Sequence, residues 1–579
     1  MRNAEIASHF DELASLYELD GASSYRVVAY RTAAKNIRDS GASVSEMARQ
    51  GKAETLPGIG KAIADKIGAL LEQGSIPSAD RLKERIPAGL VEVTRIPGLG
   101  PKRTKVLYEH LGIGSLDDLK QAAEQGRLDD VPGFGPKARD NVLAALEKGP
   151  ETPRVLLDQA LAIGGEIVDG LRDHPAVLKA ELAGSARRLA DSVKDLDVVV
   201  AASDPKAVAE AFTALPALES VSVSGEAGAK GTTHQGLPVD LRIVAEESFG
   251  NLLQHFTGSG RHNEALRTTA VRKGLHVSEY GVLDDESGTT HAFADEQEVY
   301  ALLGMSWIEP ELREDRGELE AARKDALPAL ITQDDLRGDL HCHTVASDGR
   351  NSIYEMALAA RERGYEYLAI TDHSASHGFG NDVSADELRR QIERVAEAGE
   401  KLEGITLLAG TEVNVMPDGR LDYDDEVLAA LDWIVASLHT SFRMKEAEMT
   451  ARMIAAMEHP LVDAIGHPTG RLIGRREPYA LDIDRVVGAA ARTGTFLEIN
   501  ANPNRRDLPD TLARGAAEAG VTLVVDSDAH GVDTLHKISF GVATARRAWL
   551  TPERVANTRS WPELDRLRKR ESSASSPKT

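Results

Sequence analysis

One pattern dominates the C-terminal part of the chain: after residue 338, a strand-like segment and a helix-like segment alternate about seven times. The strand-like segments read DLHCHT, YLAITDH, ITLLAGTEV, WIVASLH, VDAIGH, TFLEIN and LVVDSDAH. Parallel strands need a crossover between them, and a helix usually supplies it. The pattern therefore predicts a parallel, barrel-like α/β fold in this part of the chain.

Side chains that can bind a metal stand at the ends of these predicted strands. In a parallel barrel the C-terminal strand ends lie on one face, so ligands from distant parts of the sequence can meet there. His341 and His343 project from one side of a strand, and Cys342 between them projects from the other. One histidine alone is more often structural, whereas a set that recurs at nearly every strand end indicates a metal centre. The set is His341, His343, Asp348, His373, Glu412, His439, His467, Asp528 and His530.

Composition narrows the class of protein. The chain has 579 residues, enough for about four domains. Its single cysteine excludes an intrachain disulfide and fits a reducing cytoplasm. No apolar run approaches the roughly 18 residues of a membrane-spanning helix, and the N-terminus is too acidic for a signal peptide. We therefore expect a cytoplasmic protein with no membrane partner.

The first 150 residues carry a repeated turn that suits phosphate binding. The net charge of −24 argues against a nucleic-acid partner, but this part balances 21 basic against 21 acidic side chains. An apolar-Pro-Gly-x-Gly unit precedes a helix start at 56–60, 96–100 and 131–135. Glycine permits the tight turn and lets a phosphate approach backbone N–H groups at the helix N-terminus.

A single copy of this unit could be a mere turn between helices, but three copies with Lys or Arg close behind favour binding to the DNA backbone. The unit resembles the helix-hairpin-helix module, which holds DNA without reading its sequence. The residues expected to contact DNA are Gly58, Gly60, Lys61, Gly98, Gly100, Lys102, Arg103, Gly133, Gly135 and Lys137.

Three carboxylates stand out in the α+β pattern that begins near residue 151. Asp195 and Asp197 alternate along a predicted strand, so their side chains face the same way. Asp240 lies in the apolar strand LPVDLRIV, where a lone acid is costly to bury. Adjacent carboxylates repel unless a cation joins them, and Mg²⁺ prefers such oxygens. An Asp-x-Asp alone is usually a solvated strand edge, but the preceding Gly184-Ser185 and the third acid favour a metal site.

Over roughly residues 1–315 these motifs resemble the family X DNA polymerases. The resemblance implies a nucleotidyltransferase site in which Asp195, Asp197 and Asp240 are catalytic and hold two Mg²⁺ ions. It also implies contacts to the triphosphate, sugar and base of a dNTP and to the template strand. The residues expected to make them are Gly184, Ser185, Arg188, His255, Phe256, Gly258, Asn263 and Arg267.

Two positions qualify this resemblance. His255 stands where vertebrate relatives have a tyrosine, which puts the discrimination between deoxyribose and ribose in question. Tyr30 and Lys66 fall where the family binds a 5′-phosphate and, in repair enzymes, forms a Schiff base with an abasic sugar. Lys66 can equally be a phosphate-binding cation only.

The C-terminal motifs HxH, TDH, GTE, SLH, GHP and DxDAH resemble the PHP (polymerase and histidinol phosphatase) domain. That resemblance implies phosphoester hydrolysis at a cluster of up to three divalent ions, with Glu412 as a bridging ligand. Mixed histidine and carboxylate ligation suits Mn²⁺, Zn²⁺ or Fe²⁺. Arg471 and Arg475 either contact a phosphate or belong to a solvated loop.

The fold class expected is a multidomain chain of helical helix-hairpin-helix domains, an α+β nucleotidyltransferase palm and thumb, and a distorted (β/α)₇ PHP barrel. The boundaries expected are an N-terminal helix-hairpin-helix domain at 1–85, a fingers domain at 86–150, palm and thumb at 151–315, a linker at 316–336, the PHP domain at 337–570 and a disordered tail at 571–579.

Together the two resemblances imply a monomeric, nucleoid-associated repair polymerase. It would fill gaps in gapped or nicked double-stranded DNA with dNTPs, as in base excision repair, and its PHP domain would be a 3′→5′ exonuclease. An abasic-site endonuclease or 3′-phosphatase activity fits the same PHP site. The alternatives are a DNA-targeted small-molecule or nucleotide phosphatase with a non-catalytic polymerase-like half, and a DNA-bridging scaffold with inactive sites.

Overall fold

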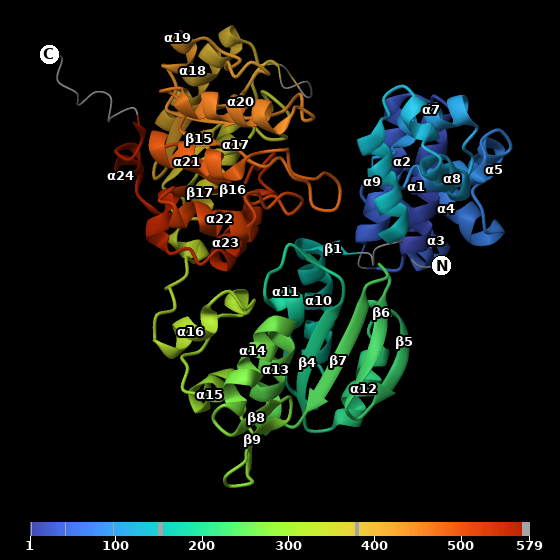
Figure 1. Ribbon diagram of the computed structural model, residues 1–579, viewed down its shortest axis with the longest axis vertical. Helices are drawn as coiled ribbons and strands as arrows, with labels where there is room; N and C mark the ends of the chain where they lie inside the picture. The colour runs from blue at the N-terminus through green and yellow to red at the C-terminus, as the bar shows by residue number, and fades with distance from the viewer. Residues whose placement is uncertain are drawn as a thin grey trace. The chain divides into compact units, whose positions relative to one another are not determined.

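The computed structural model describes residues 1, 3–40, 42–96, 98–148, 154–376, 381 and 383–569. The tail expected at 571–579 therefore lies outside the described residues. The chain forms two compact units that take alternating pieces of the sequence (Figure 1). The first unit is Met1–Val155, Gln159–Leu182 and Lys194–Phe249, and the second is Leu156–Asp158, Ala183–Val193 and Gly250–Thr579. No helix in the described ranges is long and apolar enough to cross a membrane.

Helices build the N-terminal part of the first unit, as the sequence predicts, although α1 with 17 residues and α2 with 16 are not short. The first glycine of each repeated turn has a positive φ, 71° at Gly58, 84° at Gly98 and 80° at Gly133, which suits glycine. Each turn leads directly into a helix, namely α4, α7 or α9. The helices are α1 (Asn3–Leu19), α2 (Ser24–Asp39), α3 (Val44–Arg49), α4 (Lys61–Gln73), α5 (Pro77–Lys83), α6 (Ala88–Val93), α7 (Pro101–Leu111), α8 (Leu116–Glu124) and α9 (Pro136–Lys148).

A five-stranded sheet in the order β2-β4-β7-β6-β5 completes the first unit. Its central pair, β4 and β7, is parallel, and the other pairs are antiparallel. Helix α10 (Leu157–Arg172) packs on β2, since a Cβ at Gly164 would lie 2.7 Å from Leu182. Helix α12 (Pro205–Thr213) covers β5 and β6. The strands are β2 (Val177–Leu182), β4 (Leu196–Ala202), β5 (Leu218–Gly225), β6 (Gly228–Thr233) and β7 (Pro238–Val244).

Small elements precede the barrel in the second unit, and those from α14 onwards surround an apolar core that includes Leu266, Val299 and Tyr300. A three-stranded antiparallel sheet in the order β10-β9-β8 packs there. The elements are β1 (Val155–Leu156), α11 (Gly184–Arg187), β3 (Ser192–Val193), α13 (Phe249–Thr257), α14 (Gly260–Val271), β8 (Leu275–Ser278), β9 (Gly281–Asp284), β10 (Thr290–His291), α15 (Glu296–Leu302) and α16 (Glu318–Arg323).

Seven parallel strands in chain order, β11 to β17, form the C-terminal barrel. Its ends meet where Cys342 and Ala529 form a parallel bridge and the N–H of His343 donates to the carbonyl oxygen of Ala529 at 2.8 Å. This arrangement confirms the seven-stranded parallel barrel that the sequence predicts. The strands are β11 (Gly338–Asp339), β12 (Tyr367–Ile370), β13 (Thr406–Asn414), β14 (Trp433–Ser437), β15 (Ala464–Ile465), β16 (Phe496–Asn500) and β17 (Leu523–Asp526).

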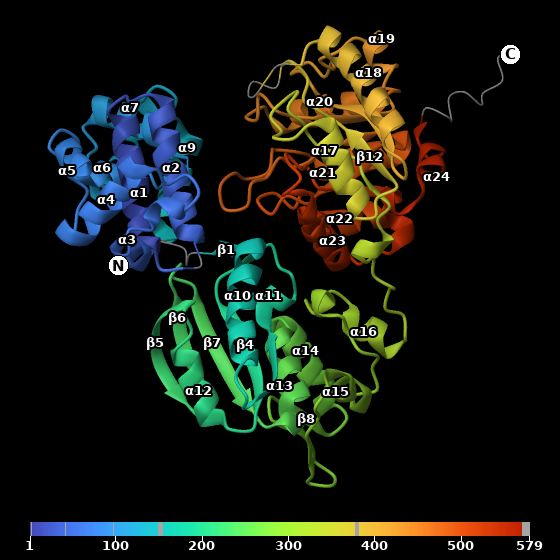
Figure 2. The same ribbon diagram turned by 180° about the vertical axis from the view of Figure 1, so that it is seen from behind.

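Helices lie around these strands (Figures 1 and 2). A core inside the barrel is built from residues at the N-terminal strand ends, among them Tyr367, Trp433 and Phe496, which leaves the C-terminal ends to the predicted ligands. The helices are α17 (Ile353–Glu362), α18 (Ala385–Lys401), α19 (Asp425–Leu428), α20 (Glu446–Glu458), α21 (Ile483–Thr493), α22 (Asp510–Glu518), α23 (Ile538–Arg547) and α24 (Trp561–Asp565).

Candidate metal centre and nucleotide site

Glu412, near the end of β13, is a buried carboxylate surrounded by five histidine rings. Such a position suits an acid that bridges metal ions. Its oxygens lie 2.7 Å from Nδ1 of His373, 2.9 Å from Nε2 of His467, 3.1 Å from Nε2 of His439, 3.4 Å from Nε2 of His341 and 3.6 Å from Nε2 of His343.

Within the described residues, three overlapping groups bring possible ligand atoms within 4.8 Å of one another, and all three are in the barrel. Together they contain eight of the nine predicted ligands, and the ninth, His467, contacts Glu412. The fold thus brings the whole predicted set together. The groups are His343, Asp348, His373 and His530; His341, His343 and Asp528; and His373, Glu412 and His439.

Glu498 is a residue of this centre that the sequence reasoning missed. It is buried in β16, where its Oε1 lies 2.6 Å from Nδ1 of His341 and its Oε2 accepts the backbone N–H of His467. A carboxylate behind a metal-binding imidazole fixes the orientation of the ring and raises its basicity. The segment TFLEIN carried a signal for it, a lone acid in an apolar strand, as in the strand of Asp240.

The charges of the centre fit a cation. Burial opposes ionisation of Glu412, yet His439, His373 and His341 hold its pKa well below the usual value. Burial, with the charges of His530 and His373, lowers the pKa of His343 to about 4, so this ring is neutral and free to ligate. The Nε2 atom of His341 is buried and makes no hydrogen bond within the described part of the chain. The surrounding carboxylates raise the pKa of His341 and of His373, so a cation that binds these two rings displaces protons. Carboxylate oxygens together with imidazole nitrogens form a donor set that suits Mn²⁺ or Zn²⁺.

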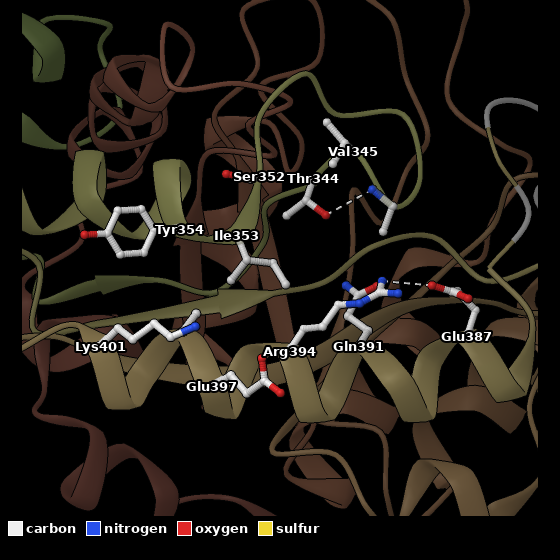
Figure 3. A pocket seen from close by; sticks show the side chains of 12 residues that line it. Thr344, Val345, Ser352, Ile353, Tyr354, Glu387, Gln391, Arg394, Glu397 and Lys401 are labelled. Carbon is white, nitrogen blue, oxygen red and sulfur yellow. Dashed lines mark hydrogen bonds and ion pairs between the residues drawn. The ribbon is translucent and has the colours of Figure 1, made fainter.

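A pocket of about 550 Å³ lies beside this centre, between the start of α17 and one face of α18 (Figure 3). Thr344, which directly follows His343, forms part of its wall and hydrogen-bonds to the carboxylate of Asp372 at 2.6 Å. Gln391 of α18 donates to the same carboxylate at 2.6 Å. Asp372, absent from the predicted set, therefore supports the loop that carries His341 and His343.

The acids of the middle sheet lie on the two central parallel strands. Asp195 immediately precedes β4, and Asp197 in β4 pairs in register with Asp240 in β7. All three are half-buried and alternate with buried residues such as Leu196, so they share one face of the sheet. Arg242 contacts Asp240 at 3.0 Å. The strand pairing brings Asp197 and Asp240 together across 43 positions of sequence, as a shared metal site requires.

Gly184 and Ser185 begin the single-turn helix α11, and Arg188 follows it. Nε of Arg188 donates to Glu314 at 3.0 Å, and its terminal nitrogen donates to the carbonyl oxygen of Thr257 at 2.9 Å. Arg188 therefore has protein partners that it must share or exchange to reach a phosphate.

The Phe256-Thr257-Gly258-Ser259 turn joins α13 to α14. Asn263 donates to the carbonyl oxygen of His255 at 2.6 Å, and a Cβ at Gly258 would lie 2.4 Å from Oδ1 of Asn263. The close approach explains glycine at this position. Burial lowers the pKa of His255, so its imidazole is neutral near pH 7. Arg267 is exposed on α14.

The helix-hairpin-helix turns differ in how their basic residues are used. Arg103 donates to the carbonyl oxygens of Gly98 at 2.8 Å and Gly133 at 3.0 Å, and it stacks 4.1 Å above the ring of Phe134. It therefore ties two of the turns together. The amino groups of Lys61, Lys102 and Lys137 belong to exposed residues, which suits contact with phosphates.

Tyr30 and Lys66 are brought together by α2 and α4. Nζ of Lys66 lies 5.7 Å from the centre of the Tyr30 ring and 3.2 Å from the carbonyl oxygen of Ala62. Tyr30 also stacks on Tyr17 with ring centres 5.4 Å apart. A cation beside an aromatic face can hold a phosphate.

Arg471 is engaged within the protein. It forms an ion pair with Asp191 at 2.8 Å and donates to the carbonyl oxygen of Arg505 at 2.8 Å. These bonds contradict the solvated-loop alternative for Arg471, and the phosphate contact stays a prediction. Arg475 is exposed.

Models of protein families match four stretches of the chain. They are a helix-hairpin-helix domain at 1–76, a SAM-like helix-hairpin-helix tandem at 90–148, a DNA polymerase beta thumb at 252–314 and a PHP domain at 339–502.

Among curated proteins, the "DNA polymerase/3'-5' exonuclease PolX" of Bacillus subtilis is 39% identical over 573 residues, which cover 98% of this chain and 100% of the relative. A protein named "Probable phosphatase" in Thermoanaerobacter sp. is 32% identical over 238 residues, 38% of this chain and 89% of the relative. Another, from Caldanaerobacter subterraneus, is 35% identical over 203 residues, 33% of this chain and 75% of the relative.

The fold and its two clusters of acids and histidines define a nucleotidyltransferase joined to a PHP phosphoesterase barrel. The chain belongs to the family X DNA polymerases that carry a C-terminal PHP domain, because its similarity to such a protein extends over nearly its whole length. Both resemblances noted in the sequence are thereby confirmed.

Proposed function

We propose that this protein is a repair polymerase that fills short gaps by template-directed addition of dNTPs and trims 3′ ends with its PHP domain. The observation that carries this proposal is the full-length similarity to a polymerase with 3′→5′ exonuclease activity, with no part of the relative left uncovered. The pairing of Asp197 with Asp240 and the complete ligand set of the barrel support it.

At the polymerase site, Asp195, Asp197 and Asp240 would hold two Mg²⁺ ions. Ions bound by these residues would lower the pKa of a primer 3′-hydroxyl and would stabilise the leaving pyrophosphate. Until they bind, Lys194 at 3.7 Å from Asp195 and Arg242 at 3.0 Å from Asp240 offset the carboxylate charges.

The nucleotide would bind between the Gly184-Ser185 turn and the Phe256–Ser259 turn. Arg188 and Ser185 would hold the triphosphate, Arg267 the template strand and Asn263 the base edge. The neutral ring of His255 would stand at the sugar, where a group other than tyrosine relaxes selection against a 2′-hydroxyl. A ratio of dNTP to rNTP insertion equal to that of a strict deoxy-polymerase would contradict this assignment.

Lys61, Lys102 and Lys137 would hold DNA phosphates on either side of a gap, together with backbone N–H groups at the helix starts after the repeated turns. Lys66 with Tyr30 would bind a 5′-phosphate. If Lys66 is also a lyase nucleophile, its amine would form a Schiff base with an abasic sugar, which trapping with borohydride would detect.

At the barrel, the nine ligands would hold up to three Mn²⁺ or Zn²⁺ ions, which polarise a phosphoester and provide a nucleophile at neutral pH. Glu498 keeps the His341 ring oriented, and Asp372 supports the loop after His343. An abasic-site endonuclease or a 3′-phosphatase activity would use the same residues, since each cleaves a phosphoester.

A second candidate is a small-molecule or nucleotide phosphatase. It is favoured by the relatives that are named "Probable phosphatase" and match only about a third of this chain. One assay separates the two: a 5′-labelled primer on a one-nucleotide gap, with and without dNTPs, beside a panel of phosphomonoesters. Extension with dNTPs and shortening without them support the repair polymerase. Hydrolysis of small phosphomonoesters with no change in the primer supports the phosphatase.

A further inference from the structure

The short loop that carries the Gly-Ser motif belongs to the same compact unit as the PHP barrel. Residues Ala183–Val193 group with Gly250–Thr579, although the chain leaves and re-enters the first unit on either side of them. Three arginines of the barrel contact this loop, and none of them has a role in the function proposed above. They are Arg471, Arg506 and Arg547.

Arg506 is fully buried, an expensive position for a guanidinium. It donates to the carbonyl oxygen of Leu189 at 2.9 Å and to Oγ1 of Thr544 at 2.9 Å, and it lies 3.3 Å from a carboxylate oxygen of Asp191. Arg471 takes the other oxygen of Asp191. The end of the loop is therefore held by two barrel arginines through both its backbone and its one acid.

Arg547, at the end of α23, holds the loop at Arg188. It donates to the carbonyl oxygen of Arg188 at 2.7 Å and to Oε1 of Glu314 at 3.0 Å, the same oxygen that accepts Nε of Arg188. Its other nitrogens contact Asp510 at 2.9–3.0 Å. Glu314 is thus shared between the nucleotide loop and the barrel.

Within the described residues, the ion pairs that join the loop to the barrel carry excess positive charge, five guanidinium groups against three carboxylates. An excess of this sign favours a polyanion such as a triphosphate. The guanidiniums belong to Arg188, Arg316, Arg471, Arg506 and Arg547, and the carboxylates to Asp191, Glu314 and Asp510.

We propose that Arg506 and Arg547 of the PHP barrel are positioning residues for dNTP binding at the polymerase site. They hold the Gly184–Leu189 loop, and Arg547 keeps the charge of Glu314 compensated when Arg188 turns to the triphosphate. Arg188 and Arg547 both form ion pairs with Glu314. If Arg547 is removed, movement of Arg188 to the triphosphate leaves the half-buried carboxylate of Glu314 without either arginine. The proposal rests on the proposed function, since it takes Arg188 as a phosphate ligand.

The test compares Arg547→Met and Arg506→Met with the wild type in the full chain, on a one-nucleotide gap in Mg²⁺. Loss of a charge-assisted contact to the loop should raise the KM for dNTP about tenfold and change kcat much less. Exonuclease activity on a 3′ end in Mn²⁺ should stay at the wild-type rate. Arg547→Lys keeps the charge but loses the planar guanidinium that bonds two partners at once. Its KM for dNTP should therefore lie between those of Arg547→Met and the wild type.

Arg492→Met is the matched control. Arg492 is an exposed barrel arginine that pairs with Glu458 at 2.8 Å, away from the loop, so its removal should leave the KM unchanged. A KM within twofold of the wild type in Arg547→Met would overturn the proposal. So would equal loss of synthesis and exonuclease activity, which would mean that the arginine only stabilises the barrel.

Two further measurements decide the matter if a variant folds poorly or if the wild type fills no gap. Asp191→Asn changes a half-exposed residue of the loop itself and removes its ion pairs with Arg471 and Arg506. An unchanged KM for dNTP in this variant would also overturn the proposal. Hydrogen exchange of the amides at 187–193 needs no activity. Faster exchange in Arg547→Met than in Arg492→Met supports the positioning role even where the proposed function fails, and equal exchange refutes it.

Discussion

At the scale of single residues, Glu412 determines what the PHP centre can do. A carboxylate that is 1% exposed keeps its charge only when favourable charge surrounds it, and His439, His373 and His341 lower the pKa of Glu412 here. Any cation that enters competes with protons for the same nitrogen atoms. Metal affinity at this centre should therefore fall as the pH falls.

The first prediction concerns the metal ligands. His343→Ala and Glu412→Gln should abolish shortening of a 3′ end, whereas gap filling in Mg²⁺ should be retained because the ligands stand at strand ends outside the apolar core. A gel assay of a 5′-labelled primer with and without dNTPs measures both activities. If His343→Ala still shortens the primer, or loses synthesis as well, the assignment of two separate sites is wrong.

The second prediction concerns the acids of the middle sheet. Asp197→Ala and Asp240→Ala should lower nucleotide addition by several orders of magnitude and leave the exonuclease intact, because a metal ligand is lost while the buried strand neighbours remain. Asp173→Ala, at an exposed acid of the same unit, is the control. Substantial synthesis by Asp240→Ala would remove that residue from the site.

At the scale of elements, α11 and α15 are joined by a buried ion cluster. Glu296, at the start of α15, accepts from Arg187 of α11 at 2.7 and 2.9 Å and also from Arg313. Burial raises the pKa of Glu296, but the charges of Arg313 and Arg187 outweigh it and lower the value from 4.5 to about 2. A partner 109 positions away leaves no local signal, so the sequence could not predict this pairing.

The third prediction follows from this pKa. A carboxyl whose pKa is lower in the folded protein stabilises the fold above pH 4.5, and the stabilisation is lost as the pH falls towards 2. The shift corresponds to about 3 kcal/mol. Glu296→Gln should therefore be less stable than the wild type at pH 7, and the difference should vanish near pH 2, as measured by urea unfolding. A difference that stays constant between pH 7 and pH 3 would contradict the ion cluster.

The fourth prediction concerns the repeated turns before α4, α7 and α9. Replacing Lys61, Lys102 and Lys137 together with Ala should reduce the slope of log affinity against log salt concentration by about one for each lysine, equally for unrelated duplexes. Lys324→Ala, at the exposed lysine that follows α16, should leave the slope unchanged. Equal slopes in the triple variant and the wild type would mean that the turns are structural.

At the scale of the whole molecule, the sequence predicted the kinds of element well but not the contacts between residues that are far apart in the chain. The strand–helix alternation predicted the barrel, and residues at strand ends predicted eight of the ligands grouped in it. The search at strand ends missed Glu498, which lies within β16. The attachment of the Gly184–Leu189 loop to α23 was also beyond reach, because Arg547 and Arg188 are 359 positions apart.

The fifth prediction uses the placement of the tryptophans. All four, Trp307, Trp433, Trp549 and Trp561, lie in the second unit. Mn²⁺ added to chelator-treated protein should raise the unfolding temperature seen by tryptophan fluorescence, since a ligand at 100 times its Kd stabilises by about 2.7 kcal/mol. In Glu412→Gln the rise should disappear. An equal rise in both proteins would place the stabilising ions elsewhere.

The alternation of the chain between its two units has a consequence for descent and for engineering. The pieces Ala183–Val193 and Gly250–Thr579 are separated in the gene by the last strands of the sheet. Recombination that exchanged the barrel alone would replace the residues that bind the Gly184–Leu189 loop, Arg506 and Arg547, by those of another protein. A chimera therefore needs the loop and the barrel from one parent.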